Sequence, residues 1–233
     1  MDERELMERS LRVGLPALGL ALDGEQISRL LDFGQAVLAQ NRVMNLTAVT
    51  DPADFARLHL LDSLALLPAA ELDGCSLLDV GTGAGFPGVP LKIACPSLRL
   101  TLLDSTAKKI RWLAQTLPGL GIEAETVAAR AEEFAPQFDV VTSRAVARLN
   151  LLCELCQPRV RVGGWFYALK GPEGEQEASE AAEAIRLLGG TLRRIDPLRL
   201  PDGQRRTIIA VEQTRPAPAG YPRPWGQMKK RPL

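Results

Sequence analysis

The sequence predicts an α/β fold in which helices cover both faces of a seven-stranded, mostly parallel sheet. Three observations lead to this prediction. From residue 75 onward, short apolar runs alternate with stretches of helical periodicity, as in strands joined by crossover helices. The first apolar run ends in a glycine-rich turn. The last two runs are separated only by residues 197–204, so we expect them to form an antiparallel pair.

The composition is that of a globular protein. The chain has 233 residues, of which 46% are hydrophobic and 24% charged. Its apolar runs are shorter than the roughly 18 residues that span a bilayer. The polar, acidic residues 1–5 do not resemble a secretory signal. We therefore expect a cytoplasmic protein with no membrane partner.

Cysteine and histidine usage gives no indication of a metal site. Cys153 and Cys156 are three residues apart, and residues at that spacing share one face of a helix. A structural zinc ion needs about four ligands. The chain has one histidine and no second cysteine pair at that spacing. We expect buried free thiols and no bound metal.

Residues 1–70 are expected to form a helical extension. Asp23 and Gln26 have the spacing of a capping box. Apolar residues behind them repeat at helical intervals, up to a polar stretch at residues 41–47. Asp51 and Pro52 then predict a second helix start, since the carboxylate can cap the helix and proline is tolerated in its first turn.

The sheet domain is expected to span residues 71–214, and residues 215–233 to form a tail. Helical apolar faces are predicted within residues 110–117 and 178–188. The net charge is +0, yet the tail carries five basic residues, no acid and several prolines, which predicts an extended basic segment. The predicted strands are residues 76–80, 98–103, 122–127, 138–142, 164–169, 191–195 and 206–212.

The turn after the first strand has the residues of a nucleotide-type cofactor site. Glycines at positions 81, 83 and 85 let the backbone turn tightly and approach a ligand with no Cβ in the way. Gly83, Gly85 and Gly88 satisfy the G-x-G-x-x-G pattern, which alone is a weak signal. Pro87 suits the start of a helix whose N-terminus faces the ligand.

Two acidic residues bear on which cofactor this turn holds. Asp104 ends the second predicted strand, where a carboxylate can accept from both hydroxyls of a ribose; NAD and S-adenosylmethionine share that ribose. Asp79 precedes the turn and would repel a diphosphate but attract the amino and sulfonium charges of S-adenosylmethionine. The expected antiparallel last strand and the absence of a second large domain point the same way. We predict S-adenosylmethionine.

A set of motifs resembles one known family. The sequence is similar to the bacterial small-subunit ribosomal RNA guanine-N7 methyltransferases, also called the glucose-inhibited division protein B family. The motifs come in the family's order and extend from about residue 40 to the C-terminus. They are Asn45-Leu-Thr47, His59-Leu-Leu-Asp62-Ser63, Asp79 to Gly88, Ser143-Arg144-Ala145, Ala168-Leu-Lys-Gly171 and Tyr221-Pro-Arg223.

The resemblance implies a Rossmann-like class I S-adenosylmethionine-dependent methyltransferase acting on 16S rRNA in the small ribosomal subunit. The family's cofactor contacts fall on Gly81, Phe86, Ala131, Glu132 and Arg144. The glycine turn and the ends of the first two predicted strands add a second set to the predicted cofactor site: Asp79, Gly83, Gly85, Asp104, Ser105 and Thr106.

The implied reaction needs no general base, because guanine N7 carries a lone pair and no proton. Alignment and a suitable charge environment then suffice. The end of the fourth strand, Thr142 to Ala145, lacks the Asn/Asp-Pro-Pro-aromatic motif of exocyclic-amine methyltransferases. Arg144 is our candidate catalytic residue. A hydrogen bond to N7 would block the nucleophile, so we expect it to contact O6, a phosphate or the cofactor, with a structural ion pair as the alternative.

Four further residues are candidates for substrate contact. The resemblance implies that His59 and Asp62 line the site, although a lone histidine is more often structural. Lys170 suits either a phosphate contact or a solvated surface charge, and Arg223 belongs to the basic tail. Together with Arg42, Lys108, Lys109 and Arg111, the tail predicts salt-dependent binding to 16S rRNA by a monomer.

Other classes of function remain compatible with the turn and the sheet alone. One is an S-adenosylmethionine-dependent methyltransferase acting on a small molecule or a protein. Another is a NAD-linked oxidoreductase, and a third is a noncatalytic Rossmann module that binds RNA. Binding of S-adenosylhomocysteine rather than NADH, and transfer of a labelled methyl group, separate these alternatives.

Overall fold

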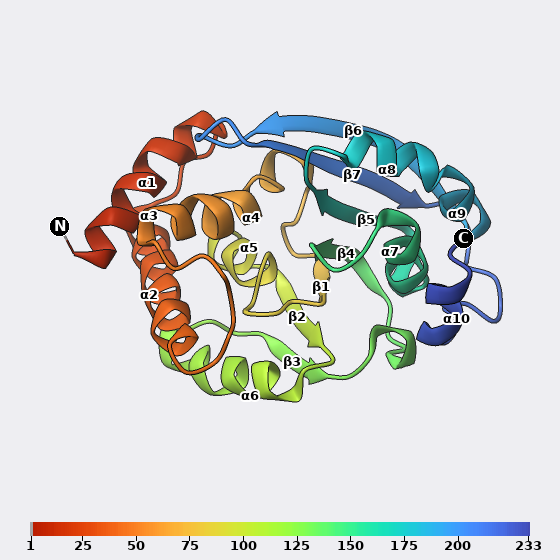
Figure 1. The fold of residues 1–233 in the computed structure, drawn as a ribbon, viewed down its shortest axis with the longest axis horizontal. Helices are drawn as coiled ribbons and strands as arrows, with labels where there is room; N and C mark the ends of the chain where they lie inside the picture. The colour runs from red at the N-terminus through yellow and green to blue at the C-terminus, as the bar shows by residue number, and fades with distance from the viewer. Residues whose placement is uncertain (1) are drawn as a thin grey trace.

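The computed structural model describes residues 2–233 and contains the predicted sheet (Figure 1). Its strand order is β3-β2-β1-β4-β5-β7-β6. The pairings among β1 to β5 are parallel, and β7 runs antiparallel to both β5 and β6. The predicted antiparallel pair at the sheet edge is thus confirmed. The strands are β1 (Ser76–Val80), β2 (Arg99–Asp104), β3 (Glu125–Ala128), β4 (Phe138–Arg144), β5 (Val160–Lys170), β6 (Gly190–Arg199) and β7 (Arg205–Gln213).

Helices precede the sheet and connect its strands. The α-helices are α1 (Glu3–Ala17), α2 (Gly24–Asn41), α3 (Pro52–Phe55), α4 (Asp62–Leu64), α5 (Gly88–Ala94), α6 (Ala107–Thr116), α7 (Leu149–Cys156), α8 (Gly174–Glu180), α9 (Ala182–Leu187) and α10 (Trp225–Lys230). One π-helical segment, η1 (Ala56–Leu61), joins α3 to α4. The 3-10 turns are η2 (Leu67–Ala69), η3 (Pro118–Leu120), η4 (Ala131–Glu133) and η5 (Gln157–Arg159).

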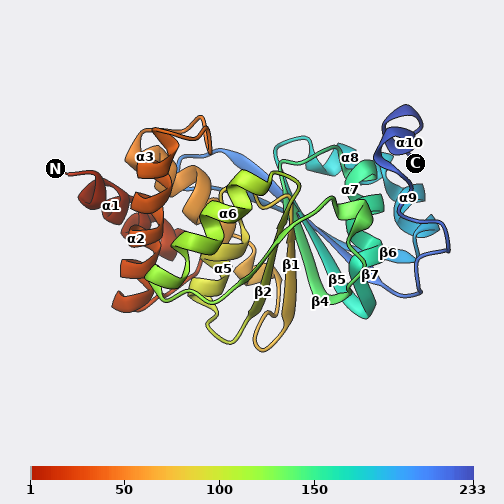
Figure 2. The ribbon, with the colours of Figure 1, turned by 90° about the horizontal axis from the view of Figure 1, so that it is seen from below.

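The sheet lies between two helical layers, as Figure 2 shows edge-on. Helices α1, α2, α5 and α6 cover one face, and α7 to α10 cover the other. Successive side chains of a strand point to opposite faces. Leu77 therefore packs in the first apolar cluster, whereas Leu78 and Val80 pack in the second. Burial on both faces explains why the parallel strands read as continuous apolar runs.

Helices α2 and α3 of the helical extension begin at the predicted capping residues. Asp23 and Gln26 form a capping box at the start of α2, and the Asp51 side chain accepts from the Asp54 N–H at the start of α3. Met7 and Phe33 belong to the same apolar cluster as Leu100 of β2. The extension therefore shares one core with the sheet.

Two expectations about helices were wrong. Residues 178–188 do not form one helix: α8 ends at Glu180 and α9 begins at Ala182. The tail is not extended throughout, because α10 packs on α7 and buries Met228 completely. The predicted burial of Cys153 and Cys156 on one helix is confirmed. Within residues 2–233, every helix is too short or too polar to cross a membrane.

Candidate active site at the carboxyl ends of the strands

A cavity of about 330 Å³ lies where β1 and β2 end. Its volume falls in the range of small-molecule sites. In open α/β sheets, ligands bind beyond the carboxyl ends of the strands, which is where this cavity lies. Five of the predicted cofactor residues line it: Gly81, Asp104, Ser105, Ala131 and Glu132.

Asp104 joins the second strand to the glycine turn. Its Oδ2 accepts a hydrogen bond from the Gly83 N–H at 2.9 Å, and its Oδ1 accepts from the Thr106 N–H at 2.7 Å. A carboxylate offers about four lone-pair sites, so each oxygen can accept a second donor. The Asp104 carboxylate can therefore receive ribose hydroxyls while it holds the turn in place.

Asp79 lies beneath the turn, fully buried. Its Oδ2 accepts from Thr82 Oγ1 at 2.7 Å and from the Gly88 N–H at 2.9 Å, whereas its Oδ1 has no partner. Burial raises the pKa of Asp79 to about 6, and the two hydrogen bonds act in the opposite direction. An unpartnered buried anionic oxygen favours a cationic ligand over a diphosphate. Asp79 does not itself line the cavity, but its negative charge behind the turn favours the sulfonium and amino charges of S-adenosylmethionine.

Gly81 is the turn residue with the closest neighbour. Its φ is +72°, and an added Cβ would lie 2.4 Å from Val146 Cγ2. The Gly81→Ala variant is expected to push Val146 into the cavity and to weaken S-adenosylhomocysteine binding by about tenfold or more. The left-handed backbone alone costs about 1–2 kcal/mol for a non-glycine residue. Calorimetric titration measures the binding loss.

Gly19→Ala is the matched control for this prediction. Gly19 has a similar φ of +69°, with nothing within 4 Å of its added Cβ, and it does not line the cavity. The control shares the backbone strain and should leave binding intact. Equal loss of binding in both variants would show that strain, and not the contact with Val146, is responsible.

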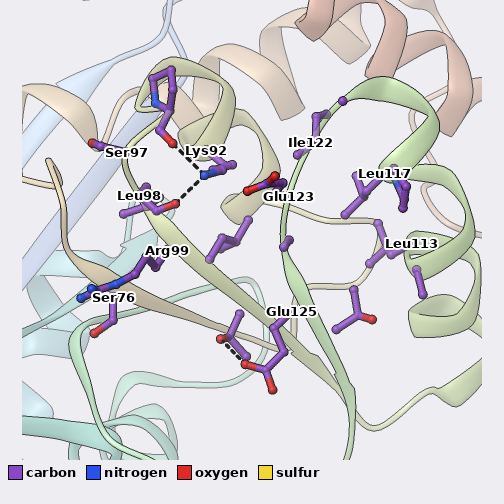
Figure 3. A pocket seen from close by; sticks show the side chains of 18 of the residues that line it. Ser76, Lys92, Ser97, Leu98, Arg99, Leu113, Leu117, Ile122, Glu123 and Glu125 are labelled. Carbon is purple, nitrogen blue, oxygen red and sulfur yellow. Dashed lines mark hydrogen bonds between the residues drawn. The ribbon is translucent and has the colours of Figure 1, made fainter.

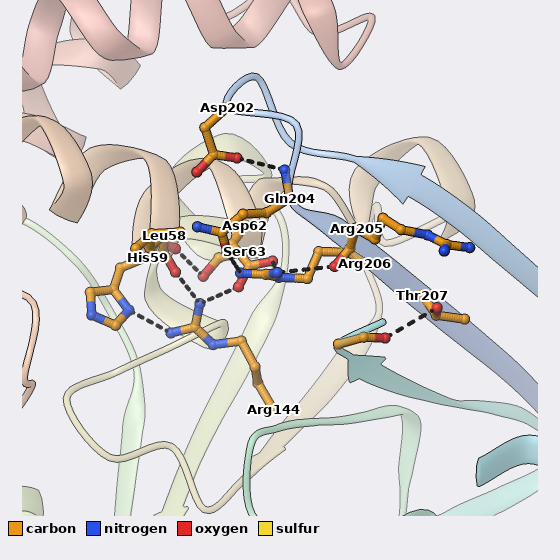
Figure 4. Close-up of polar contacts among 11 residues, drawn as sticks. Leu58, His59, Asp62, Ser63, Arg144, Asp202, Gln204, Arg205, Arg206 and Thr207 are labelled. Carbon is orange, nitrogen blue, oxygen red and sulfur yellow. Dashed lines mark hydrogen bonds and ion pairs between the residues drawn. The ribbon is translucent and has the colours of Figure 1, made fainter. Parts of the chain in front are cut away.

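A second cluster, centred on Arg144, links β4 to the helical extension (Figure 4). Arg144 Nη1 donates to the Leu58 carbonyl and to Asp62 Oδ2, both at 3.0 Å. Asp62 Oδ1 accepts from Arg206 Nε at 2.9 Å. The side chains of Asp62 and Arg144 are only 9% and 12% exposed. One carboxylate thus bridges two arginines, from β4 and from β7.

The π-helical segment η1 places the remaining partners of Arg144. Single π-turns are rare and often occur at functional sites. His59, within η1, has its Nδ1 3.0 Å from Arg144 Nη2 and its Nε2 2.6 Å from Thr47 Oγ1. Arginine cannot accept a hydrogen bond, so Nδ1 is the acceptor and Nε2 carries the proton that Thr47 receives. His59 is therefore neutral, and its only basic lone pair is engaged.

His59 and Phe86 connect the Arg144 cluster to the glycine turn beside the cavity. Their rings stack with centroids 5.0 Å apart, and the Arg144 guanidinium lies 5.3 Å from the centroid of the Phe86 ring. Phe33 and Phe55 also pack against Phe86, which is 5% exposed. The side chain of Phe86 thus packs between the extension and the glycine turn, outside the lining of the cavity.

The neutral state of His59 predicts a pH dependence of stability. Burial, followed by the charge of Arg144, lowers the pKa of His59 to about 3. The unfolded chain binds a proton at His59 below about pH 6.5. Between pH 6.5 and 3 the unfolded state therefore holds more protons than the folded state, and the free energy of unfolding decreases as the pH is lowered. Relative to His59→Gln, the wild type should lose about 1.4 kcal/mol of unfolding free energy for each pH unit between 6.5 and about 3.

Urea unfolding of both proteins at pH 7.5 and pH 5.0 measures this difference. We expect the advantage of the wild type to shrink by about 2 kcal/mol between these pH values. An advantage that stays constant would mean that His59 titrates in the folded protein as it does in the unfolded chain.

Lys170 and Arg223 lie in internal ion pairs. Lys170 is 7% exposed, donates to the Ala147 carbonyl at 2.6 Å and pairs with Glu177 at 2.7 Å. The expectation of a solvated surface charge at Lys170 was therefore wrong. Arg223 pairs with the fully buried Glu154. Both arrangements favour structural roles, and substrate contact by either residue stays a prediction.

Sequence reasoning did not single out several residues of the cavity and of the network around Arg144. Val146, Leu155 and Trp225 line the cavity, and Arg206 contacts Asp62. Trp225 is the one tryptophan in a proline-rich basic tail, which was a usable signal. Arg206 gave none, since nothing in the sequence relates the start of β7 to residue 62.

A larger cavity, of about 1060 Å³, lies near the amino ends of β1 and β2 (Figure 3). Several of its polar side chains bond to the protein itself. Lys92 donates to the carbonyls of Pro96 and Leu98, and Thr101 donates to Glu125. None of the predicted cofactor residues lines it. Its position at the amino ends of the strands and the absence of predicted cofactor residues from its lining make it the poorer candidate site.

Comparisons with known proteins agree with this geometry. A family model described as rRNA small subunit methyltransferase G, GidB, matches residues 26–207. A relative from Pelotomaculum thermopropionicum, named Ribosomal RNA small subunit methyltransferase G, is 41% identical over 98% of this chain and 99% of its own length. A relative of the same name from Acetivibrio thermocellus is 38% identical, covering 100% of both chains.

Solved structures show the fold alone. The magnesium protoporphyrin IX methyltransferase ChlM from Synechocystis PCC 6803, with bound SAM, matches with a TM-score of 0.57 and 15% identity over 82% of this chain and 98% of that one. The mitomycin 7-O-methyltransferase MmcR matches with a TM-score of 0.56 and 17% identity over 78% and 60%.

The sheet with its antiparallel β7, together with the glycine turn and the acids at the ends of β1 and β2, defines a class I S-adenosylmethionine-dependent methyltransferase. Within that class, the chain belongs to the family of rRNA small subunit methyltransferase G. The resemblance found in the motifs is thus confirmed at the level of the family.

Proposed function

We propose that this enzyme transfers a methyl group from S-adenosylmethionine to N7 of a guanine in 16S rRNA of the small ribosomal subunit. The names of its relatives support ribosomal RNA of that subunit as the substrate. The observation that carries the choice of atom is that the imidazole beside Arg144 has no free lone pair, since His59 Nδ1 accepts from Arg144, while the Asp62 carboxylate is held between two arginines. A ring nitrogen without a proton needs no base.

We propose the following roles for the cofactor residues. S-adenosylmethionine supplies an electrophilic methyl group on a sulfonium. Asp104 accepts the ribose hydroxyls, and Gly81 allows close backbone approach. Ser105, Ala131 and Glu132 complete the wall. The unpartnered Oδ1 of Asp79 supplies negative potential beneath the turn. These groups hold the donor in one orientation, and orientation accounts for much of the acceleration in a transfer without acid–base steps.

Arg144 is the proposed contact with the guanine. Three of the five N–H groups of an arginine are used here, by Leu58, Asp62 and His59. The Nε–H and one Nη2 N–H remain for O6 of the base or for a phosphate. The network holds the guanidinium in place before substrate arrives, so less rotamer entropy is lost on binding.

The RNA would reach the site across a basic surface at the start of α6. Lys108 is exposed, and no acidic side chain within residues 2–233 lies within 4.0 Å of the charges of Lys108, Lys109 or Arg111. A Lys108→Ala/Lys109→Ala variant is expected to raise KM for the RNA substrate with little change in kcat. It should also weaken the salt dependence of KM, because fewer counterions are released on binding. An unchanged KM at every salt concentration would exclude this surface.

We also propose that three segments of the chain have different roles. Residues 71–214 carry most of the cofactor site and residues 215–233 add Trp225 to its lining, whereas residues 1–70 supply His59 and Asp62 to hold Arg144. Residues 215–233 form an accessory segment. A monomer suffices for this arrangement, since every residue invoked comes from one chain.

The test of the function is methyl transfer to small ribosomal subunits from a strain that lacks this methylation. Subunits and protein-free 16S rRNA are incubated separately with labelled donor, and the product is mapped by mass spectrometry. We expect one 7-methylguanosine, formed with at least one of the two substrates. Label on an exocyclic amine or on a ribose would contradict the choice of atom. Absence of label from both RNAs would contradict the substrate.

A further inference from the structure

The tail of the protein, residues 215–233, is docked against α7. Met228 of α10 is fully buried in the apolar cluster that contains Leu152 and Leu155. Asn150 Nδ2 donates to the carbonyl of Leu233 at 3.2 Å. A segment that the sequence predicts to be an extended basic arm therefore has a fixed place on the sheet domain.

One ion pair fixes the start of this docked segment. Glu154 of α7 has no exposed surface. Its Oε1 accepts from the backbone N–H of Arg223 at 2.9 Å and from Arg223 Nε at 2.7 Å, and its Oε2 accepts from Nη2 at 2.5 Å. Nη2 also donates to the Arg231 carbonyl at 3.0 Å. Charge-assisted, bidentate bonds of this kind are short and directional.

The same pair places an aromatic side chain at the cofactor cavity. Trp225 follows Arg223 by two residues, and Leu155 follows Glu154 directly. Both Trp225 and Leu155 line the cavity that also contains Asp104 and Gly81. Figure 2 shows α10 on the α7 side of the sheet, opposite to α6. The tail thus adds a wall to a cavity whose other lining comes from the ends of β1 and β2, from the loops after β1, β2, β3 and β4, and from Leu155 of α7.

The chemistry of that wall matches one part of the methyl donor. The ribose, amino, carboxylate and sulfonium groups of S-adenosylmethionine are polar or charged. Its adenine is a flat ring with apolar faces. An indole offers a large apolar surface and packs favourably against another aromatic ring.

We propose that Trp225 contacts the adenine of the bound donor and that the Glu154–Arg223 pair is the positioning device that holds Trp225 there. This inference rests on the assignment of the 330 Å³ cavity to the donor. It does not depend on which RNA is methylated.

Tryptophan emission tests the contact directly. The chain has three tryptophans; Trp112 is in α6 and Trp165 in β5, and neither lines the cavity. S-adenosylhomocysteine should change the emission of the wild type and of Trp165→Phe, but not of Trp225→Phe. By calorimetry, Trp225→Ala should raise the Kd of S-adenosylhomocysteine about tenfold, and Trp225→Phe by less, since a ring remains.

The positioning role is tested by a double-mutant cycle. Glu154→Gln should raise the Kd several-fold when Trp225 is present but have no further effect in the Trp225→Ala background, because the pair acts through Trp225. Arg223→Lys, which keeps the charge but not the bidentate geometry, is the alternative if Glu154→Gln folds poorly. Additive effects would show that the pair is merely structural and would overturn this role.

The Asp104→Ala variant distinguishes two outcomes: that Trp225 does not contact the donor, and that the donor does not bind in this cavity. If Asp104→Ala abolishes binding while Trp225→Ala leaves the Kd unchanged, the cavity binds the donor and the proposal for Trp225 is overturned. If neither change affects the Kd, the donor binds elsewhere and both the proposal and the assignment of the cavity are overturned.

Discussion

Replacement of Arg144 by alanine is expected to lower kcat about 100-fold or more, because a misplacement of reacting groups by about 1 Å can cost that much. It removes the proposed guanine contact and all three bonds that tie β4 to Leu58, His59 and Asp62. The variant should also lose about 3 kcal/mol of unfolding free energy. This is the lower end of the cost of breaking a buried ion pair, since Arg206 still partners Asp62.

Two matched variants separate the catalytic role of Arg144 from its structural one. Arg144→Lys keeps the charge but cannot reach three acceptors at once, so kcat should stay low while stability partly recovers. Arg206→Ala removes the other cation on Asp62 and leaves every bond of Arg144 in place. It should cost stability but less than tenfold in kcat. An Arg144→Ala enzyme that methylates at the normal rate would rule out Arg144 as a catalytic residue.

Replacement of Asp104 by alanine is expected to raise the Kd of S-adenosylhomocysteine at least about 100-fold. Hydrogen bonds to a charged group contribute about 1.5–3 kcal/mol each, and the carboxylate is proposed to accept from two ribose hydroxyls. The variant also frees the N–H groups of Gly83 and Thr106, which loosens the turn. Isothermal titration measures the change.

Asp104→Asn and Glu125→Ala complete this experiment. The asparagine has one acceptor oxygen in place of two, so an intermediate loss of about tenfold is expected. Glu125 lines the larger cavity of Figure 3, and its removal should leave the Kd unchanged. Weaker binding in Glu125→Ala with normal binding in Asp104→Ala would show that the donor binds in the larger cavity.

Much of the fold could be predicted because its signals are local. Apolar runs buried on both faces identified the central strands, whereas β3 and β6 lie at the edges of the sheet and are only partly buried. Asp23, Asp51 and the glycines after β1 marked helix starts and the turn. The tail was mispredicted for a physical reason. Proline and basic residues suggest an extended, solvated chain, but Met228 and the buried Glu154 give this segment tertiary partners that outweigh its composition.

From the residues alone, the candidate site was predictable only where its members follow strands; His59 and Asp62 were named only through the family resemblance. Asp104, Ala131 and Glu132 converge on one cavity because the ends of neighbouring parallel strands meet at one edge of the sheet. The network around Arg144 depends on two contacts across more than 80 residues of sequence, one between Asp62 and Arg144 and one between Asp62 and Arg206. A single sequence carries no signal for such pairings. The same holds for the neutral state of His59, which depends on its burial and on Arg144.

The central claim is that the cavity at the ends of β1 and β2 holds the methyl donor, and a crystal structure with S-adenosylhomocysteine tests it most directly. The account predicts the ribose on Asp104, the backbone of Gly81 against the homocysteine portion and the adenine beside Ala131 and Trp225. A crystal soaked with the ligand in which this cavity is empty or obstructed, or in which a nicotinamide dinucleotide displaces the ligand from it, would contradict the account.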